Sequence, residues 1–201
     1  IKNIILTTSI YERFEDQQKP VIEFELIELW IHSAVTASAA EGIGALVDEV
    51  EPDVCFTAGL IKDCGLIALA MHCSESINDI MKCQASDKIS LFEAEQKVIG
   101  ITHAEIGALM LENWGFPKEL SEAIKNCYEA ENGNPESKLS GVIGLAKFLA
   151  ESWGYGYEIQ NGGSKDINPL LEAVNLSMKE FSSWEQRLKD NAIHVANVIM
   201  N

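Results

Sequence analysis

The sequence predicts an all-helical protein, and three observations carry this prediction. Apolar residues recur at helical spacing along most of the 201-residue chain, and no segment alternates convincingly with a period of two. Start and stop signals for helices follow one another closely, so the expected connections are short. Hydrophobic residues make up 47% of the chain, which at this length is enough to bury a substantial core. We therefore expect one helical bundle without internal repeats.

The first third of the chain predicts two long helices. Apolar residues repeat at helical spacing over residues 21–47. Asp53, which directly follows a proline, predicts the start of the next helix. That helix contains the stretch 55–72, which is almost entirely apolar except for the adjacent residues Lys62 and Asp63. An ionisable pair in such a helix requires a physical explanation.

Three shorter helices are predicted next. Residues 74–84 and 90–100 are amphipathic, and each segment opens with a serine that we expect to be its N-cap. Thr102 and Glu105 have the spacing of a capping box, and Gly115 predicts the end of the helix that they open. The apolar residues that recur at helical spacing in this third helix are Ile106, Leu109, Met110 and Trp114.

The remainder of the chain predicts four more helices and one clear loop. Helical patterns cover residues 117–131 and 138–153. Residues 154–166 are rich in glycine and polar residues and predict a surface loop. Two C-terminal helices follow, the last of them over residues 182–200.

The charge balance argues against several classes of partner. Acidic residues number 31 and basic residues 15, which gives a formal charge of −16. Binding to nucleic acid or to anionic lipid depends on Lys and Arg, so neither partner is expected. An acidic surface confers solubility and would favour basic protein partners, although a simple solvated surface is the better explanation.

The sequence also bears on the compartment. It contains no run of 18 or more uninterrupted apolar residues, so no membrane span is expected. The first residues do not follow the basic, apolar and small-residue order of a signal peptide. The first residue is not Met, which favours a trimmed chain or a fragment. Five cysteines without a C-x-x-C motif indicate neither a zinc ribbon nor a disulfide framework. We expect reduced thiols in a cytoplasmic protein.

Asp63 is the first candidate for a functional residue. Apolar neighbours predict that it is buried, and a buried carboxylate must be paired, hydrogen-bonded or bound to a metal. Because adjacent residues of a helix point about 100° apart, Lys62 and Asp63 are not expected to face one site. The simpler alternative is that Lys62 reaches solvent while Asp63 bonds a neighbouring helix. His32 and His103, taken alone, are more simply a core residue and a first-turn residue.

Four sequence blocks together resemble a known family. In order they are "LWIHSA", "FTAGLIKDCGLIAL", "GITHAEIGALMLENWGFPKELSEAIKNCYE" and "LSGVIGLAKFLA". They resemble the HDOD domain, a helical relative of the HD-type metal-dependent phosphohydrolases found in bacterial signalling proteins. The resemblance implies an HDOD helical bundle over residues 1–155, whose usual leading helical segment is missing. Residues 156–201 are expected to form a loop and helices packed on the same domain.

The resemblance also implies a degenerate metal site. It places the first His ligand at His32 and the Asp of the His-Asp pair at Asp63. The two other ligand positions hold Lys62 and Lys147, and two ammonium groups repel a divalent cation. We therefore expect no metal, no other cofactor and no hydrolase activity. The residues of the predicted remnant pocket are His32, Lys62, Asp63, His103, Cys127, Tyr128 and Lys147.

The explanation predicted for the buried pair is an ion pair that replaces the metal. Asp63 would keep the carboxylate of the old site. Lys147, or less plausibly Lys62, would supply the positive charge that the metal once supplied, with His32 nearby. This hypothesis makes the pair a structural remnant that stabilises the core.

The resemblance favours a non-catalytic signalling module that acts through protein–protein contacts. The candidate contact surfaces are the acidic helices and the loop that carries Tyr155 and Tyr157. Two alternatives remain. The first is a phosphohydrolase or phosphodiesterase that recruits metal through His32, Asp63 and His103. The second is a sensor that binds a phosphate-containing ligand through Lys62 or Lys147.

Overall fold

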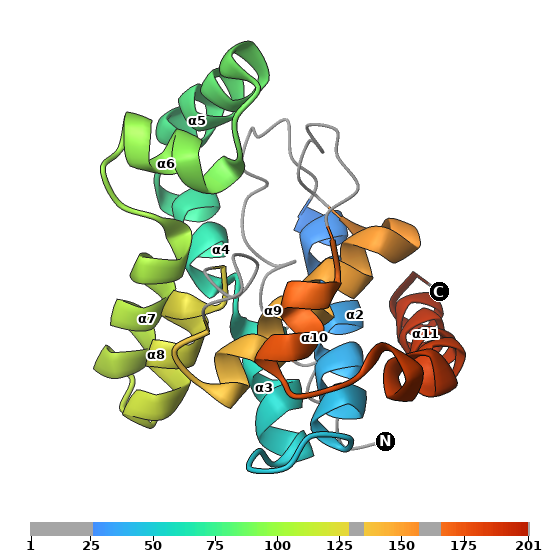
Figure 1. Ribbon diagram of the computed structural model, residues 1–201. Coiled ribbons are helices and arrows are strands. Elements are labelled where there is room, and N and C mark those ends of the chain that lie inside the picture. The colour runs from blue at the N-terminus through green and yellow to red at the C-terminus, as the bar shows by residue number, and fades with distance from the viewer. Residues whose placement is uncertain (1–25, 129–134, 157–165, 201) are drawn as a thin grey trace.

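The computed structural model describes residues 26–128, 135–156 and 166–200, and all regular elements in these ranges are helical (Figure 1). The all-helical prediction is confirmed for these residues. The elements in chain order are α2 (Leu26–Gly44), α3 (Pro52–Ile61), α4 (Cys64–His72), α5 (Ser74–Asp87), α6 (Leu91–Val98), α7 (His103–Asn113), α8 (Lys118–Asn126), α9 (Lys138–Ala150), the π-helix η2 (Glu151–Tyr155), α10 (Asn168–Ala173) and α11 (Met178–Met200).

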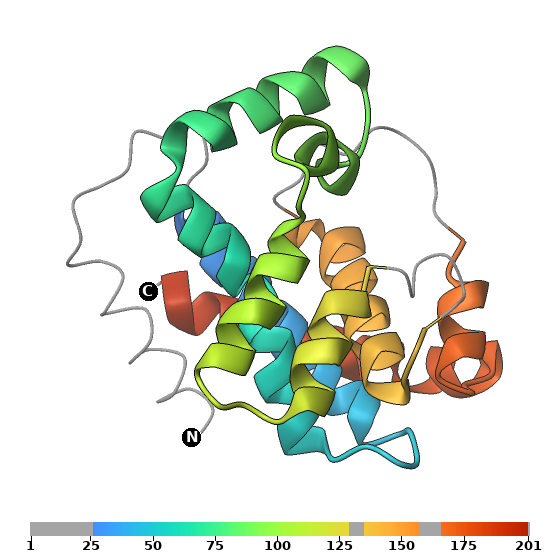
Figure 2. The ribbon, with the colours of Figure 1, turned by 90° about the vertical axis from the view of Figure 1, so that its left-hand side faces the viewer.

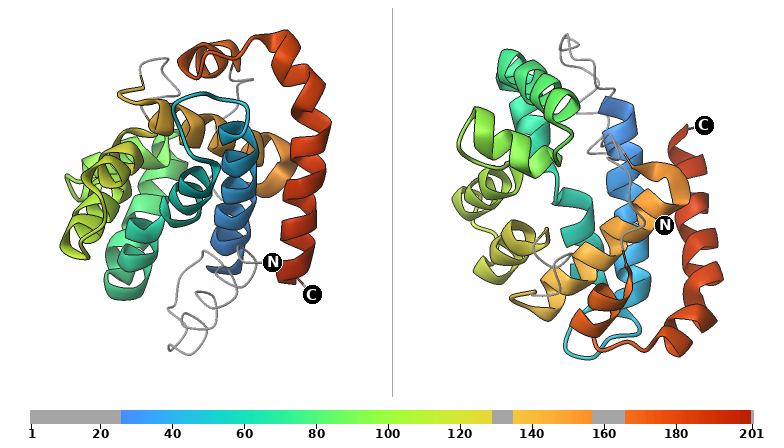
Figure 3. Two further views of the ribbon diagram at one scale, coloured as in Figure 1. Left: turned by 90° about the horizontal axis from the view of Figure 1, so that it is seen from below. Right: turned by 45° about the horizontal axis from the view of Figure 1, so that its top comes forward.

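Helix α2 lies at the centre of the fold. It packs against α3, α9 and α11, and Figure 3 shows α11 running along it. Residues 32–40 of α2 are all buried, and most of them are Ala, Ser or Thr. Small side chains allow neighbouring helices to approach closely on several sides. The helix ends at Gly44 rather than at residue 47, and its predicted start at residue 21 lies outside the described residues.

The apolar stretch after Pro52 differs from the prediction of one continuous helix. It forms α3 and α4, separated by a turn at Lys62 and Asp63. Asp63 has φ −98° and ψ 14° and is the N-cap residue of α4. The segment Pro52–His72 is long and apolar enough to cross a membrane by length and composition, yet 61% of its most apolar window is buried inside the fold. Core helices of soluble proteins commonly have these properties.

Helices α4 and α7 pack at very short distance. A Cβ atom added at Gly65 would lie 2.6 Å from the backbone nitrogen of Gly107 and closer still to the carbonyl oxygen of His103. Only glycine allows this approach of two backbones. The contact fixes Asp63, at the start of α4, relative to His103, at the start of α7.

The capping predictions are confirmed in two of three cases. Thr102 accepts a hydrogen bond from the Glu105 amide, and Ser90 opens α6 with an equivalent capping box. The expected N-cap at Ser74 is wrong, because Cys73 occupies that position and α5 follows α4 almost without a break. Gly115, with φ +75°, ends α7 as predicted.

The C-terminal helices lie against the same body. Helix α10 contacts α9, and α11 packs along α2. Leu170, Phe181 and Leu188 join the main hydrophobic core, which also includes residues of α2, α8 and α9. On the opposite side, α5 and α6 form a projecting pair above α4 and α7, which is clearest in Figure 2.

We predict that Gly65→Ala strongly destabilises the fold. The new methyl group would meet backbone atoms that cannot rotate away, so we expect a loss of about 3 kcal/mol in the free energy of unfolding, the upper range for overpacking. Gly141→Ala is the control: its Cβ would lie 3.1 Å from a side-chain atom of Val174, which can adjust. Equal losses in chemical denaturation of the two variants would contradict the close packing of α4 on α7.

Candidate functional site

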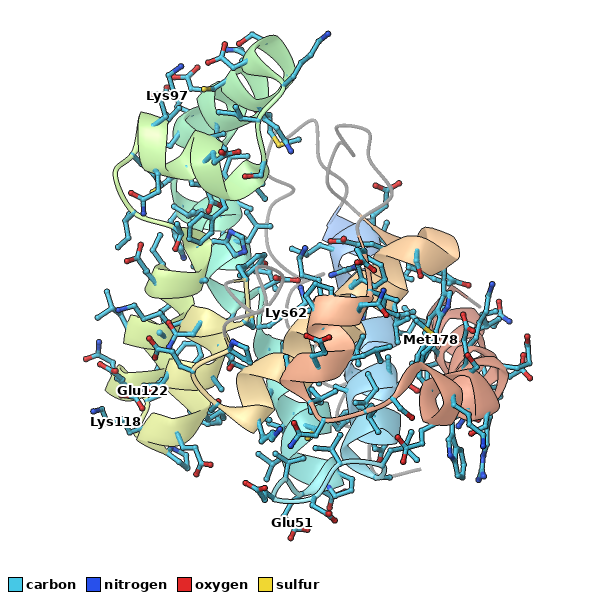
Figure 4. All side chains as sticks on the ribbon, viewed as in Figure 1. Glu51, Lys62, Lys97, Lys118, Glu122 and Met178 are labelled. Atoms are coloured by element: carbon cyan, nitrogen blue, oxygen red, sulfur yellow. The ribbon has the colours of Figure 1, made fainter. Side chains whose placement is uncertain are left out.

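Six of the seven residues predicted for the remnant pocket lie in one buried polar network. They come from α2, the α3–α4 turn, α7, the end of α8, and α9, and Figure 4 labels Lys62 in the interior of the molecule. The seventh, Cys127, lies in the main hydrophobic core, where its thiol donates a hydrogen bond to the Ile124 carbonyl. The six network residues are His32, Lys62, Asp63, His103, Tyr128 and Lys147.

Asp63 is paired with Lys62. The Lys62 Nζ donates a hydrogen bond of 2.5 Å to Asp63 Oδ2, and both side chains are fully buried. The expectation that these neighbours cannot face one site is wrong. It assumed regular helical geometry, whereas the helix is broken at these two residues. The break allows Lys62 to point inward instead of reaching solvent.

Lys147 has a different principal partner from the one predicted. Its Nζ donates a hydrogen bond of 2.5 Å to Glu151 Oε1 and lies 5.1 Å from the centroid of the Tyr128 ring. The hypothesis that Lys147 is the main partner of Asp63 is therefore wrong, and Lys62 has that role. Glu151 was missed, although its position four residues after Lys147 on a helix is a recognisable signal.

Tyr128 connects Asp63 to His103. The Tyr128 hydroxyl donates to Asp63 Oδ1 at 3.0 Å and accepts from His103 Nε2 at 2.5 Å. His103 Nδ1 contacts both carboxylate oxygens of Glu95, at 2.7 and 2.8 Å. Glu95 was also missed by the sequence analysis. Its spacing from Leu91, one helical turn earlier, places it on the buried stripe of α6.

His32 is held from the other side. Its Nδ1 donates to the Tyr155 carbonyl at 2.7 Å, and its Nε2 lies 3.8 Å from Asp63 Oδ2. Tyr155 ends η2 and is half-buried. The backbone of Tyr155 thus belongs to the buried network. The sequence predicts the loop that contains Tyr155 as a contact surface. Tyr157, predicted for the same surface, lies outside the described residues.

The surroundings shift the pKa values of these groups in different directions. Burial and the Lys62 ammonium hold the pKa of His32 well below its usual value, so His32 is neutral. Burial alone would raise the pKa of Asp63, but the Lys62 ammonium and protonated His103 lower it far below the usual range. Burial lowers the pKa of His103, as it does for His32. The effect of the Glu95 carboxylate on His103 is larger than that of burial and raises this pKa above 6.5.

The charged side chains that the structure describes in this network include both cations and carboxylates. When His103 is protonated, both of its ring nitrogens are donors, which fits their contacts with Glu95 and Tyr128. Among the described residues, three cations then pair with three carboxylates. The cations are Lys62, Lys147 and protonated His103, and the carboxylates belong to Asp63, Glu95 and Glu151.

This arrangement does not fit a metal ion. The ammonium group of Lys62 occupies the coordinating face of Asp63, and a divalent cation there would be repelled. Lys147 adds a second buried ammonium group to the network. In the part of the chain that the structure describes, no three His, Cys, Asp or Glu side chains are grouped as metal ligands.

Comparison with known proteins identifies similar chains. The family model of the HDOD domain matches residues 1–130. An HDOD domain protein of unknown function from Geobacter sulfurreducens is similar in structure, with a TM-score of 0.76 and 18% identity over 96% of this chain and 70% of that one. No curated protein sequence matches the chain.

Two further solved structures are similar in fold. One, from Marinobacter aquaeolei, is provisionally described as a signal transduction protein; its TM-score is 0.73 and its identity 18%. This chain is covered over 99% of its length but spans only 44% of that protein. The other, from Shewanella amazonensis, is provisionally described as a phosphohydrolase, with a TM-score of 0.59 and 21% identity over 90% of this chain and 62% of that one.

Lys62→Met is predicted to be severely destabilising. It leaves the buried carboxylate of Asp63 without its ammonium partner, and breaking a buried pair costs about 3–5 kcal/mol. The double variant Lys62→Met/Asp63→Asn removes both charges and should recover much of this loss. Lys82→Met is the matched control, because Lys82 pairs with Asp79 on the surface and should contribute less than about 1 kcal/mol. Similar urea-unfolding energies for the two single variants would contradict the buried pair.

The stability of the protein is predicted to depend on pH through His103. The pKa of His103 is higher in the folded protein than its ordinary value of 6.5, so protonated His103 stabilises the folded state. This contribution to the free energy of unfolding is complete below pH 6.5 and is lost as the pH rises through the folded pKa. His103→Gln should lack this loss. His72→Gln, which changes an exposed histidine, should retain it. Unfolding free energies measured from acidic to alkaline pH test the difference, and parallel curves for wild type and His103→Gln would contradict it.

Proposed function

Because this chain belongs to the HDOD domain family, we propose that it is a non-catalytic regulatory module of bacterial signal transduction that works through contacts with other proteins. The family places it among HD-like domains, and one similar structure carries the provisional description of a signal transduction protein. The proposal extends beyond this likeness and draws on the chemistry of the buried network.

The observation that carries the proposal is the position of the Lys62 ammonium. It bonds Asp63 at 2.5 Å, where an HD-type site would hold its metal, and both groups are shielded from water. A metal ion that coordinated Asp63 would compete with the Lys62 ammonium for this carboxylate and would be repelled by it at short distance. The desolvation cost of each buried charge is several kcal/mol. We infer that the former active site now stabilises the fold.

The similarity to a provisionally described phosphohydrolase makes hydrolysis the principal alternative. Hydrolysis by this fold requires a metal to activate water. His32 and Asp63 remain, but His32 Nε2 lies 3.8 Å from a carboxylate that already accepts hydrogen bonds from Lys62 and Tyr128. This geometry favours the regulatory function over the hydrolytic one.

A sensor for phosphate-containing ligands receives less support than the regulatory module. Lys62 and Lys147 each bond a carboxylate at 2.5 Å. An incoming phosphate would compete with these carboxylates for the two ammonium groups and would be repelled by the carboxylates. The buried position of both lysines adds to that cost.

We further propose that the module is cytoplasmic and that residues 156–201 belong to it. All five cysteines are free thiols, which suits a reducing compartment. Helices α10 and α11 share the main hydrophobic core with the preceding helices, which supports a single functional unit.

The proposal predicts that the purified protein holds less than one equivalent of metal. The untagged protein would be grown with added Mn, Fe and Zn, and its bound metal would be measured by elemental mass spectrometry. Since Lys62 and Lys147 replace ligands, the variant Lys62→His/Lys147→Asp should gain metal and be less stable without it. Stoichiometric metal in the wild type, lost in His32→Ala or Asp63→Ala, would overturn the proposal and make phosphodiesterase assays necessary.

A further inference from the structure

Helix α7 has its small residues inside and several of its large ones outside. Ala104, Gly107 and Ala108 are buried on the side that packs against α4. The sequence predicts an apolar repeat on this helix, yet two members of that repeat are largely exposed: Leu109 at 53% and Trp114 at 61%. The close approach of α4 leaves no room for a large side chain at Gly107, although Leu111 is buried farther along the helix. Packing within the described fold therefore does not explain why the exposed residues Leu109 and Trp114 are apolar.

The backbone of the turn between α7 and α8 is fixed at Trp114 and Phe116. The Trp114 amide donates to the Met110 carbonyl, and the Phe116 amide donates to the Leu111 carbonyl, both at 3.0 Å. Gly115 has φ +75°, which completes a Schellman-type helix end. Phe116, 38% exposed, follows directly. A turn fixed in this way loses little conformational freedom when a partner binds.

From these observations we propose that Leu109, Trp114 and Phe116, here named the α7–α8 patch, bind an apolar peptide segment flanked by Lys or Arg in a partner protein. The inference rests on the proposed regulatory function and gives it a surface. Trp is the residue type most enriched among the dominant residues of protein interfaces, and it provides a large apolar area with few rotatable bonds. Figure 2 shows α7 and α8 side by side on the near face of the molecule.

The charges near the patch determine the chemistry of the partner. Glu112 lies one helical turn from Leu109 and is exposed, and Glu119 and Glu122 are exposed on α8. Lys118 bonds Glu122 at 3.0 Å, and Figure 4 shows both side chains on the outer side of α8. The whole chain carries a charge of −16. A basic flank on the peptide would match this surface and would be steered toward it.

The same charges disfavour other occupants. A second copy of the chain would bring one acidic surface against another, because a two-fold contact pairs the same patch with itself. Anionic lipid would be repelled by the acidic residues. An apolar peptide with basic flanks satisfies both the exposed aromatic residues and their acidic surroundings.

The test is a selection of phage-displayed random peptides on the intact protein. Trp114→Ala is used to identify peptides that require the patch, and Trp184→Ala is the matched control. Trp184 is a tryptophan of α11, 37% exposed, with the Arg187 guanidinium 5.1 Å from the centre of its ring. Circular dichroism and thermal unfolding would establish that both variants fold.

The expected result is enrichment of peptides that combine aromatic or aliphatic residues with Lys or Arg. Their Kd, measured by calorimetry, should rise on the order of 30-fold or more in Trp114→Ala and stay unchanged in Trp184→Ala. Glu112→Lys/Glu119→Lys should also weaken binding. Asp48→Lys/Glu49→Lys, which reverses two charges on the α2–α3 connection, should weaken it much less, because that connection lies outside the patch.

Several outcomes would overturn the inference. They are no enrichment, enrichment that survives Trp114→Ala, equal weakening by both charge-reversal variants, and a dimer in sedimentation that is lost in Trp114→Ala. The metal content of the purified protein shows whether the peptide site alone is refuted or the proposed regulatory function as well. A metal-free protein without a peptide site refutes the patch alone, whereas stoichiometric metal refutes the regulatory function on which it rests.

Discussion

The burial of the Asp63 carboxylate is the constraint on which the centre of this fold depends. A carboxylate removed from water is tolerated only when cations and donors surround it. Lys62 and Tyr128 supply the direct hydrogen bonds, and His103 and His32 lie 3.8 Å away. Each of these groups comes from a different element, so the network also fixes how the helices meet. A break in the helix at Lys62 makes this possible, because it directs two adjacent side chains to one point.

Local signals in the sequence predicted much of the fold, and long-range contacts limited the rest. The capping boxes at Ser90 and Thr102 depend on residues three positions apart, so spacing alone identifies them. The choice between Lys62 and Lys147 as the partner of Asp63 depends on a break in the backbone that no local pattern marks. The exposure of Leu109 and Trp114 could not be predicted either. Helical periodicity identifies an apolar face, but it does not show whether the rest of the fold covers that face.

Glu95 and Glu151 are the two network residues that were not predicted from the sequence, and both serve as counterions. Glu95 lies on the buried stripe of an amphipathic helix, and Glu151 follows its lysine by one turn. Each would have been found by asking where the compensating charge for a buried cation lies. Matching every predicted buried cation with a carboxylate at helical spacing is therefore a useful step for other degenerate active sites.

The pairing of buried cations with carboxylates among the described residues has an evolutionary consequence. Replacing Lys62 by a histidine ligand alone would remove one positive charge from a buried set that is otherwise matched, and replacing Lys147 by aspartate alone would add a negative charge. Each intermediate on the way back to a metal centre is thus less stable than its starting point until a cation is bound. The substitutions are coupled, because each one alone leaves a buried charge with fewer compensating groups. The buried pairs thus constrain which single substitutions the interior tolerates, whereas the outer surface is free to vary.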